Sequence, residues 1–228
     1  MAETLVLSVG GSIIIPPTGF DIEFLKQFRQ LILEAVEGGQ RFVLIVGGGA
    51  TCRQYQKALA AVTTTSQTDL DWLGIQTTIF NAHFVRLMFG DRAYPEVTTD
   101  PGVEFKLDKP IIVAAGWQPG CSTDKDAVHW AKRLGAKTIF NLSNTDFVYD
   151  KDPQKHPDAK RLEKIDWATF RREIVGENWT PGKNAPFDPV ASKLAESLKL
   201  RVGILRGTNL GAVRLALSGQ PFPGTVVE

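Results

Sequence analysis

The sequence predicts an α/β protein: a three-layer α/β/α sandwich with a mostly parallel central sheet. Short apolar runs recur along the chain, and segments with apolar residues at helical spacing lie between them. Three of these runs end in glycine-containing turns. Regular alternation of buried strands and amphipathic helices is typical of a parallel sheet covered by helices on both faces. The runs expected to form the main strands are residues 4–9, 41–46, 110–115, 137–142 and 201–205.

Two strands in the first part of the chain lead directly into glycines. The first ends at Gly10-Gly11-Ser12 and the second at Gly47-Gly48-Gly49. We expect the helix between them to begin near Asp21, a favourable N-cap residue, and to stop at Gly38-Gly39. A further helix follows the second turn and carries Arg53 in its first turns.

A polar loop over residues 63–68 precedes a long predicted helix. Its expected start is Asp69 or Asp71, and its expected end is Gly90. Residues 91–109 have an irregular pattern. The short strands expected within them are residues 96–97 and 103–105.

The third glycine turn, Gly116 to Gly120, joins a buried strand to a helix expected over residues 126–134. Such a turn directs unpaired backbone N–H groups and the positive end of the helix dipole toward an anion. Ser122 and Thr123 add hydroxyl groups there, and Asp124 adds a fixed negative charge. Taken alone, the same residues also fit an ordinary capped strand-to-helix turn.

The last third of the chain continues the alternation. A polar stretch at 151–164 leads to a short helix expected near 166–175, and a loop at 176–187 follows. Asp188-Pro189 then combines an N-cap with a proline at the first helical position. The closing elements are a strand at 201–205, a helix at 210–217 and a strand at 225–227.

Composition and charge exclude several classes of protein. The chain has 228 residues, of which 43% are hydrophobic, and a formal net charge of +1. A near-neutral chain without a basic block does not fit a broad nucleic-acid-binding or membrane-binding surface. No apolar stretch reaches the roughly 18 residues of a transmembrane helix, and the first residues lack the cationic segment of a secretory signal. We therefore expect a cytoplasmic protein, and a chain of this length suits one large α/β domain or two small ones.

The residues that commonly bind metals are scattered. Cys52 and Cys121 form no metal-ligand spacing and are expected to be reduced thiols. His83, His129 and His156 lie far apart in the chain. No protein-borne metal site is predicted.

The three glycine turns together indicate phosphate binding. Parallel α/β sheets bind ligands beyond the carboxyl ends of their strands. If the turns converge there, their backbone N–H groups suit a polyphosphate or two phosphorylated ligands. No G-x-x-x-x-G-K-[ST] occurs, and no strand is followed by G-x-G-x-x-G, so neither a P-loop nor a dinucleotide-binding fold is supported.

Six segments, in the same order, resemble the amino acid kinase family and, within it, the archaeal-type uridylate (UMP) kinases. They are Gly10-Gly11-Ser12; Gly47-Gly48-Gly49 with Arg53 and Tyr55; Asp71 with Gly74-Ile75 and Asn81-Ala82; Gly116 to Asp124; Ser143 to Tyr149 with Asp152-Pro153; and Asp188-Pro189 with Ala191 and Lys193. The resemblance covers nearly the whole chain. It implies an amino acid kinase (carbamate kinase-like) fold and transfer of the γ-phosphoryl of ATP to UMP, with Mg²⁺, in pyrimidine nucleotide biosynthesis.

The resemblance also implies site residues. The chain would be a single amino acid kinase domain over residues 1–228. Its acceptor-binding part would span about residues 1–140 and its ATP-binding part about 141–228. Residues matching UMP contacts are Gly47, Gly48, Gly49, Arg53, Asp71, Ser122 and Thr123. Residues matching ATP contacts are Ser12, Ser143, Asn144, Asp146, Tyr149 and Asp152. Catalytic matches are Asp124 as the central organiser of cationic groups, Gly10 and Gly11 as the cradle of the transferred phosphoryl, and Lys193. UMP kinases of this family are usually homohexamers, so a homo-oligomer is implied.

Ordinary structural roles remain open for several of these residues. Arg53 could be a solvated side chain, Asp71 a helix cap and Asp152-Pro153 a simple turn. Trp117 fits either stacking on a base or packing at a subunit contact.

Three positions depart from the family pattern. Ser8 stands where many members carry a lysine that neutralises the transferring phosphoryl, which leaves Lys183, Lys193 and Mg²⁺ as candidate cations. Phe147 replaces a glycine and is bulky enough to reshape the ATP pocket. Ile79 replaces an arginine near the acceptor. Two alternatives therefore stay open: a relative that phosphorylates a carboxylate or carbamate, and a non-catalytic nucleotide-binding or storage protein on the same fold.

Overall fold

The computed structural model describes residues 4–104, 108–176 and 185–228. The strands within them are β1 (Thr4–Val9), β2 (Arg41–Val46), β3 (Ile111–Ala114), β4 (Thr138–Ser143), β5 (Val148–Tyr149), β6 (Arg161–Leu162), β7 (Lys164–Ile165), β8 (Arg201–Arg206) and β9 (Thr225–Val227). The helices are α1 (Gly11–Ile14), α2 (Ile22–Glu37), α3 (Gly49–Val62), α4 (Gln67–Phe89), η1 (Gly90–Arg92), α5 (Thr123–Leu134), α6 (Trp167–Thr169), η2 (Phe170–Val175), α7 (Pro189–Ser197) and α8 (Leu210–Leu217).

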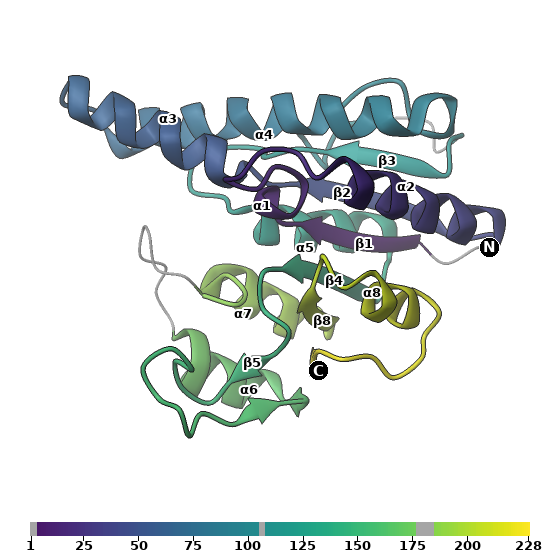
Figure 1. Cartoon of the computed structure of the whole chain (residues 1–228), viewed down its shortest axis with the longest axis vertical. Helices are drawn as coiled ribbons and strands as arrows, with labels where there is room; N and C mark the ends of the chain where they lie inside the picture. Colours follow the sequence, from purple (N-terminus) through teal and green to yellow (C-terminus); the bar gives the residue numbers. More distant parts are fainter. Residues whose placement is uncertain (1–3, 105–107, 177–184) are drawn as a thin grey trace.

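Within the described residues, seven strands form one sheet in the order β3-β2-β1-β4-β8-β9-β7. The strands β3, β2, β1, β4 and β8 pair in parallel, while β9 runs antiparallel to β8. The short strands β5 and β6 form a separate antiparallel pair. Figure 1 shows helices on both faces of the sheet, so the three-layer, mostly parallel architecture is confirmed.

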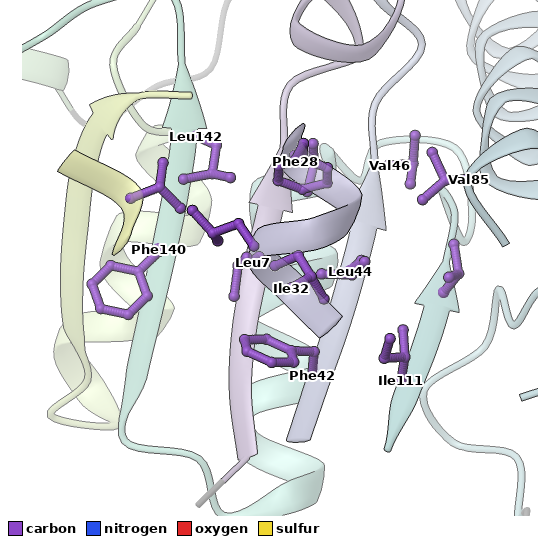
Figure 2. Packing of buried hydrophobic residues seen from close by; sticks show 14 of the residues in the cluster. Leu7, Phe28, Ile32, Phe42, Leu44, Val46, Val85, Ile111, Phe140 and Leu142 are labelled. Atoms are coloured by element: carbon purple, nitrogen blue, oxygen red, sulfur yellow. The ribbon is translucent and has the colours of Figure 1, made fainter. Parts of the chain in front are cut away.

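One face of the sheet is covered by α2, α4 and α8. Alternate residues of the parallel strands point to this face, as the two-residue period of a strand requires. Figure 2 shows Phe28 and Ile32 of α2 lying over Leu7 and Leu44 of the sheet. Both helix side chains are fully buried, and burying each contributes roughly 1.5–3 kcal/mol of apolar transfer.

The other face is covered by α5, α6, η2 and α7. Val6 of β1 and Ile139 of β4 point into this layer, whose largest fully buried side chain is Trp130 of α5. Because both faces are covered, the central strands carry almost continuous apolar sequence rather than an alternating pattern.

The predicted caps of two helices are confirmed. The Asp21 side chain accepts a hydrogen bond from the Phe24 N–H at the start of α2, and Asp188 accepts one from the Ala191 N–H at the start of α7. The long helix α4, however, begins earlier than expected. Its N-cap is Ser66, so Asp69 and Asp71 lie inside the helix. Ser66 ends a polar stretch with several possible caps, and only the backbone geometry distinguishes them.

Other predicted details were wrong. The turn after β1 already holds the short helix α1, and α5 begins at Thr123, before residue 126. No strand forms at 96–97; instead Ala93 and Thr98 make isolated parallel bridges to β3. The 103–105 prediction lies partly outside the described residues. The polar stretch 151–164 contributes β6 and the first residue of β7. Strand β6 pairs with the preceding strand β5, whereas β7 pairs with β9 near the end of the chain.

The pair α3 and α4 extends to one end of the molecule (Figure 1). Ala50 is the buried residue of α3, so most of this helix faces solvent. Across the described residues, no helix combines the length and the apolarity that crossing a membrane requires.

Candidate active site

The glycine turns after β1 and β2 meet at the carboxyl edge of the sheet. A Cβ atom placed on Gly47 would lie 2.7 Å from the Gly11 nitrogen, and one on Gly49 would lie 2.6 Å from the Gly11 carbonyl carbon. Gly49 also has φ of +64°, a conformation that favours glycine. Any side chain at these positions would force the two turns apart, so glycine is required by their contact.

The amide groups of these turns are not equivalent. Gly10 donates its N–H to the Leu142 carbonyl at 3.0 Å, and Gly47 donates to Val9 at 3.0 Å. Gly11 and Gly49 are the first residues of α1 and α3, and amides at that position have no acceptor within their own helix. Fewer amide groups are therefore free to bind a ligand than predicted, because the Gly10 amide already donates to β4.

Asn81 of α4 holds the second glycine turn from behind. Its side-chain nitrogen donates to the carbonyl oxygens of Gly47 and Gly48, at 2.9 and 3.2 Å. The side chain is buried, with 1% of its surface exposed. Asn81 therefore fixes which way the peptide groups of this turn face.

Arg53 and Ser12 join the two turns on their outer side. The Arg53 guanidinium donates to the Ser12 hydroxyl at 3.0 Å, although the residues come from α3 and α1. Arg53 is exposed and close to both turns, which suits a group that binds an anion there. The structure thus brings Ser12 beside a predicted acceptor residue, whereas the sequence had grouped it with the ATP residues.

The third glycine turn is attached to α4 at both ends. Gly116 donates its N–H to the Thr78 hydroxyl at 2.9 Å, and Gly120 donates to the Asp71 carboxylate at 3.0 Å. Thr78 also lies next to the second turn, since a Cβ on Gly48 would be 3.6 Å from the Thr78 methyl group. All three glycine turns therefore converge on one region, which was the condition for their acting together.

Asp124, at the start of α5, connects the two halves of the sheet. One carboxylate oxygen accepts a hydrogen bond from the Ser8 hydroxyl at 3.0 Å, and the other accepts the Asp188 N–H at 3.1 Å. Burial raises the pKa of Asp124 to about 6, and these two hydrogen bonds oppose part of that rise. The carboxylate thus lies between the end of β1 and the N-terminus of α7.

The residues on either side of Asp124 differ in chemistry. The Ser122 side chain caps α5 by accepting the Lys125 N–H at 3.2 Å, and Thr123 is the first helical residue. Asp126 is fully buried and accepts the Trp117 N–H at 3.3 Å. Burial raises the pKa of Asp126 to about 7, and the nearby Asp124 charge acts in the same direction.

Apart from Ser12 on α1, the residues predicted to bind ATP lie at the end of β4 and beyond it, but they do not all share one environment. The Ser143 hydroxyl accepts the Thr145 N–H at 3.2 Å. The Asp146 carboxylate accepts a hydrogen bond from Arg206 at 2.9 Å, at the end of β8. This pairing with Asp146 raises the pKa of Arg206. Arg206 therefore places a permanent positive charge at this edge of the sheet.

Asp152 has the geometry of a turn. Its side chain accepts the Gln154 N–H at 2.9 Å and forms an exposed ion pair with Lys155 at 3.6 Å. Asn144 is exposed, and Tyr149 is half-buried in β5. Lys193 is an exposed residue of α7.

Phe147 lies beside Arg161 of β6. The guanidinium carbon is 5.1 Å from the ring centroid, within the range of a cation–π contact. Phe147 also lines a cavity of about 520 Å³ together with residues 219–224. Of the other departures, Ser8 contacts Asp124 directly, and Ile79 packs against the apolar core. Lys183 lies outside the described residues.

Two residues of the site were missed from the sequence, and a third was noted without a role. Thr78 acts from α4 through backbone groups, and Arg206 acts from the end of a strand predicted only for its apolar core. Asn81 was part of the family resemblance, but its contacts with Gly47 and Gly48 were not predicted. Each of the three lies far along the chain from its partner, so no local pattern reveals the contact. The sequence did offer one signal of a buried polar contact, which is the position of Asp126 within the apolar face of α5.

The fold and this site define an α/β protein with a mostly parallel sheet, whose three glycine turns converge beside the buried carboxylate of Asp124. The sequence profile described as the amino acid kinase family matches residues 3–206, and the chain belongs to that family. It is 33% identical over 226 residues to a uridylate kinase of Methanospirillum hungatei, covering 98% of this chain and 94% of the relative. A uridylate kinase of Pyrococcus abyssi is 36% identical over 203 residues, covering 88% of this chain and 87% of the relative.

A solved structure agrees with this placement. The uridylate kinase of Archaeoglobus fulgidus superposes with a TM-score of 0.83 at 26% identity, covering 98% of this chain and 99% of that one. A UMP kinase structure from Bacillus anthracis, at 20% identity and a TM-score of 0.79, supports the fold.

Proposed function

We propose that this protein is a UMP kinase, which transfers the γ-phosphoryl group of ATP to UMP and gives ADP and UDP. The observation that carries the proposal is the position of Asp124, which touches β1 through Ser8 and α7 through Asp188. A carboxylate there faces the region where the acceptor-side glycine turns approach the second half of the sheet. Similarity to uridylate kinases over 98% of the chain supports UMP as the acceptor.

The acceptor phosphate would bind at the first two glycine turns. Gly48 and Gly49 lie at the N-terminus of α3, whose dipole favours an anion, and Arg53 adds a guanidinium one turn later. Gly47 contributes the shape of the turn. Asp71, Ser122 and Thr123 would contact the nucleoside from α4 and α5, with Asp71 also holding the Gly120 amide.

The donor would bind on the other half. In this proposal the chain is one domain with an acceptor part at about 1–140 and an ATP part at about 141–228. Ser143, Asn144, Asp146 and Tyr149 lie at the ends of β4 and β5. Asp152 would act by shaping the turn that follows, and Ser12 would approach ATP from α1.

Phosphoryl transfer requires two anions held in line and neutralisation of the charge that spreads over the transferring group. Gly11 and Gly10 would shape the cradle for that group, and Lys193 would supply a cation from α7. UMP arrives with its phosphate already ionised, so no general base is needed. Asp124 would instead orient the Asp188 amide and the Ser8 hydroxyl around the reaction centre.

Mg²⁺ would enter as the Mg-ATP complex. The described residues contain no group of three His, Cys, Asp or Glu side chains able to hold an ion by themselves. A magnesium ion commonly keeps waters and substrate phosphates among its ligands, which fits this site. The ion would supply charge neutralisation, and Ser8 supplies none.

We also propose a cytoplasmic homo-oligomer, a hexamer by family resemblance. An exposed apolar stripe runs along α4 through Trp72, Phe80 and Leu87, with 46%, 75% and 65% of their surfaces exposed. A second copy of the chain covering this stripe would remove it from water. The expected cytoplasmic location rests on reduced thiols at Cys52 and Cys121, which are unpaired.

The decisive experiment is ADP release with Mg-ATP against UMP, CMP, dTMP, acetylglutamate and carbamate. Selective turnover of UMP supports the proposal, and turnover of a carboxylate or carbamate instead would assign another activity of the family. Silence across the panel, with ATP or UMP still raising the melting temperature, would indicate a nucleotide-binding or storage protein.

A further inference from the structure

Trp117 is held by α5 through both its backbone and its ring. Its N–H donates to Oδ2 of Asp126 at 3.3 Å. Its indole meets the His129 ring edge to face, with centroids 5.5 Å apart and planes at 77°. Asp126 and His129 are three positions apart on the helix, so they lie on the same side of α5.

The remaining anchors of this turn come from α4. Thr78 accepts the Gly116 N–H and Asp71 accepts the Gly120 N–H. The segment between residues 116 and 120 is therefore fastened from two helices, which come from separate parts of the chain. The hydrogen bond to Asp126 fixes its α5 side.

The chemistry of Asp126 is unusual for its location. None of its surface is exposed, and its second oxygen, Oδ1, has no hydrogen-bond partner among the described residues. The charges that act on its pKa are those of Lys125 and Asp124 on the same helix, and Asp124 is a like charge. A buried carboxyl with an unsatisfied oxygen lowers stability, and an apolar side chain of similar size would avoid that cost. Among the interactions of the described residues, the Trp117 N–H is the one that requires an acceptor at this position.

We infer that Asp126 is a positioning residue that fixes the 116–120 turn, through the Trp117 amide, in the geometry that receives the acceptor nucleotide. This inference rests on the proposed function. The turn leads into Ser122 and Thr123, so a displaced turn changes the acceptor side and leaves the donor side intact. The effect is on KM for UMP, because the residue acts on binding geometry rather than on the reacting atoms.

The test compares Asp126→Leu with Asp126→Asn. The leucine removes the acceptor of the Trp117 hydrogen bond and keeps an apolar side chain of similar size in the buried position. The asparagine retains an oxygen that accepts the same bond. We expect Asp126→Leu to raise KM for UMP roughly tenfold, with KM for ATP changed less than about twofold, and Asp126→Asn to restore KM for UMP.

A matched control is Asp166→Leu. Asp166 caps α6 by accepting the Thr169 N–H at 2.9 Å, so this variant also loses a carboxylate-to-amide hydrogen bond, at a distance from the turn. Both KM values should stay at the wild-type level. Thermal unfolding identifies the folded variants, and Asp126→Ala serves as a second acceptor-free variant.

The outcomes separate the two proposals. Wild-type protein without UMP turnover overturns the proposed function before any variant is measured. Wild-type turnover together with an unchanged KM for UMP in a folded Asp126→Leu or Asp126→Ala protein overturns the positioning role alone. An equal rise in both KM values, or no recovery in Asp126→Asn, also overturns it.

Discussion

The Ser8 hydroxyl donates a hydrogen bond of 3.0 Å to the Asp124 carboxylate, although 116 positions separate the two residues. Ser8 is the position at which many amino acid kinases carry a lysine. The side chain here therefore keeps contact with the central carboxylate while bringing no positive charge. Arg206 on β8 and Arg53 on α3 are described residues that place cations at the same edge of the sheet.

Asp124→Asn should abolish most activity. The asparagine side chain is isosteric with aspartate, but its amide nitrogen would face either the Ser8 hydroxyl or the Asp188 N–H, both of which donate toward Asp124. We expect kcat to fall about 100-fold or more, since misdirected polar groups at a reaction centre cost that much. Steady-state ADP release measures the loss. A melting-temperature rise with ATP or UMP should persist, and unchanged turnover would contradict the assigned site.

Arg53→Ala should weaken acceptor binding selectively. Loss of a guanidinium next to the phosphate-type turn should raise KM for UMP about tenfold or more, because charge-assisted hydrogen bonds are lost. KM for ATP should change little. Lys57→Ala, an exposed residue one turn along α3, is the control and should leave both values unchanged. Equal effects of the two variants would indicate that Arg53 is only a solvated side chain.

Asp126→Asn should change how stability depends on pH. The pKa of Asp126 is raised from 3.8 to about 7, so the folded protein binds this proton more tightly than the unfolded chain does. Ionisation therefore costs stability progressively as pH rises from about 4 to about 7, by at most about 4 kcal/mol. The asparagine variant has no such ionisation and so does not lose this stability. The raised pKa of Asp124 affects wild type and variant alike, so it cancels in the comparison.

Urea unfolding at pH 4.5, 6 and 8 checks that prediction. The free energy of unfolding of Asp126→Asn, relative to wild type, should grow with pH and level off above about pH 7. A difference independent of pH would show that Asp126 ionises in the folded protein as readily as in the unfolded chain.

Phe147→Ala should affect stability more than ATP binding. The ring contacts Arg161 and lines the cavity near Phe222, so its removal should cost about 2 kcal/mol of unfolding free energy, less than a fully buried phenylalanine. KM for ATP should stay within about twofold of wild type. Chemical unfolding and steady-state kinetics measure the two effects, and a large change in KM for ATP would place the ring in the donor pocket.

Phe80→Glu should disrupt the proposed oligomer. A charge in the middle of the α4 stripe would have to be desolvated when a second copy covers it. Sedimentation velocity should show a smaller species than wild type. Val62→Glu is the control, because Val62 is also exposed, at 82%, but lies at the end of α3. The interface lies elsewhere if both variants keep the wild-type mass.

Much of the architecture was predictable because it depends on local properties. Apolar runs identified the five parallel strands, and Asp21 and Asp188 marked helix starts through side-chain caps that act over three residues. The start of α4 was missed because several neighbouring residues are acceptable caps. The strands β6 and β7 were missed because two-residue strands carry no periodic pattern. Strand β7 also depends on a distant partner, β9.

The sequence by itself determined the order of the main strands and helices along the chain, the three glycine turns and the family to which they point. Those features follow from backbone propensity and from the spacing of apolar residues. Only the tertiary structure decided that Gly11 packs against Gly49, that Gly10 donates its amide hydrogen to β4, and that Asp126 binds Trp117. Each of these contacts joins groups from different elements. Those elements are brought together by the strand order of the sheet, which is set by long-range packing.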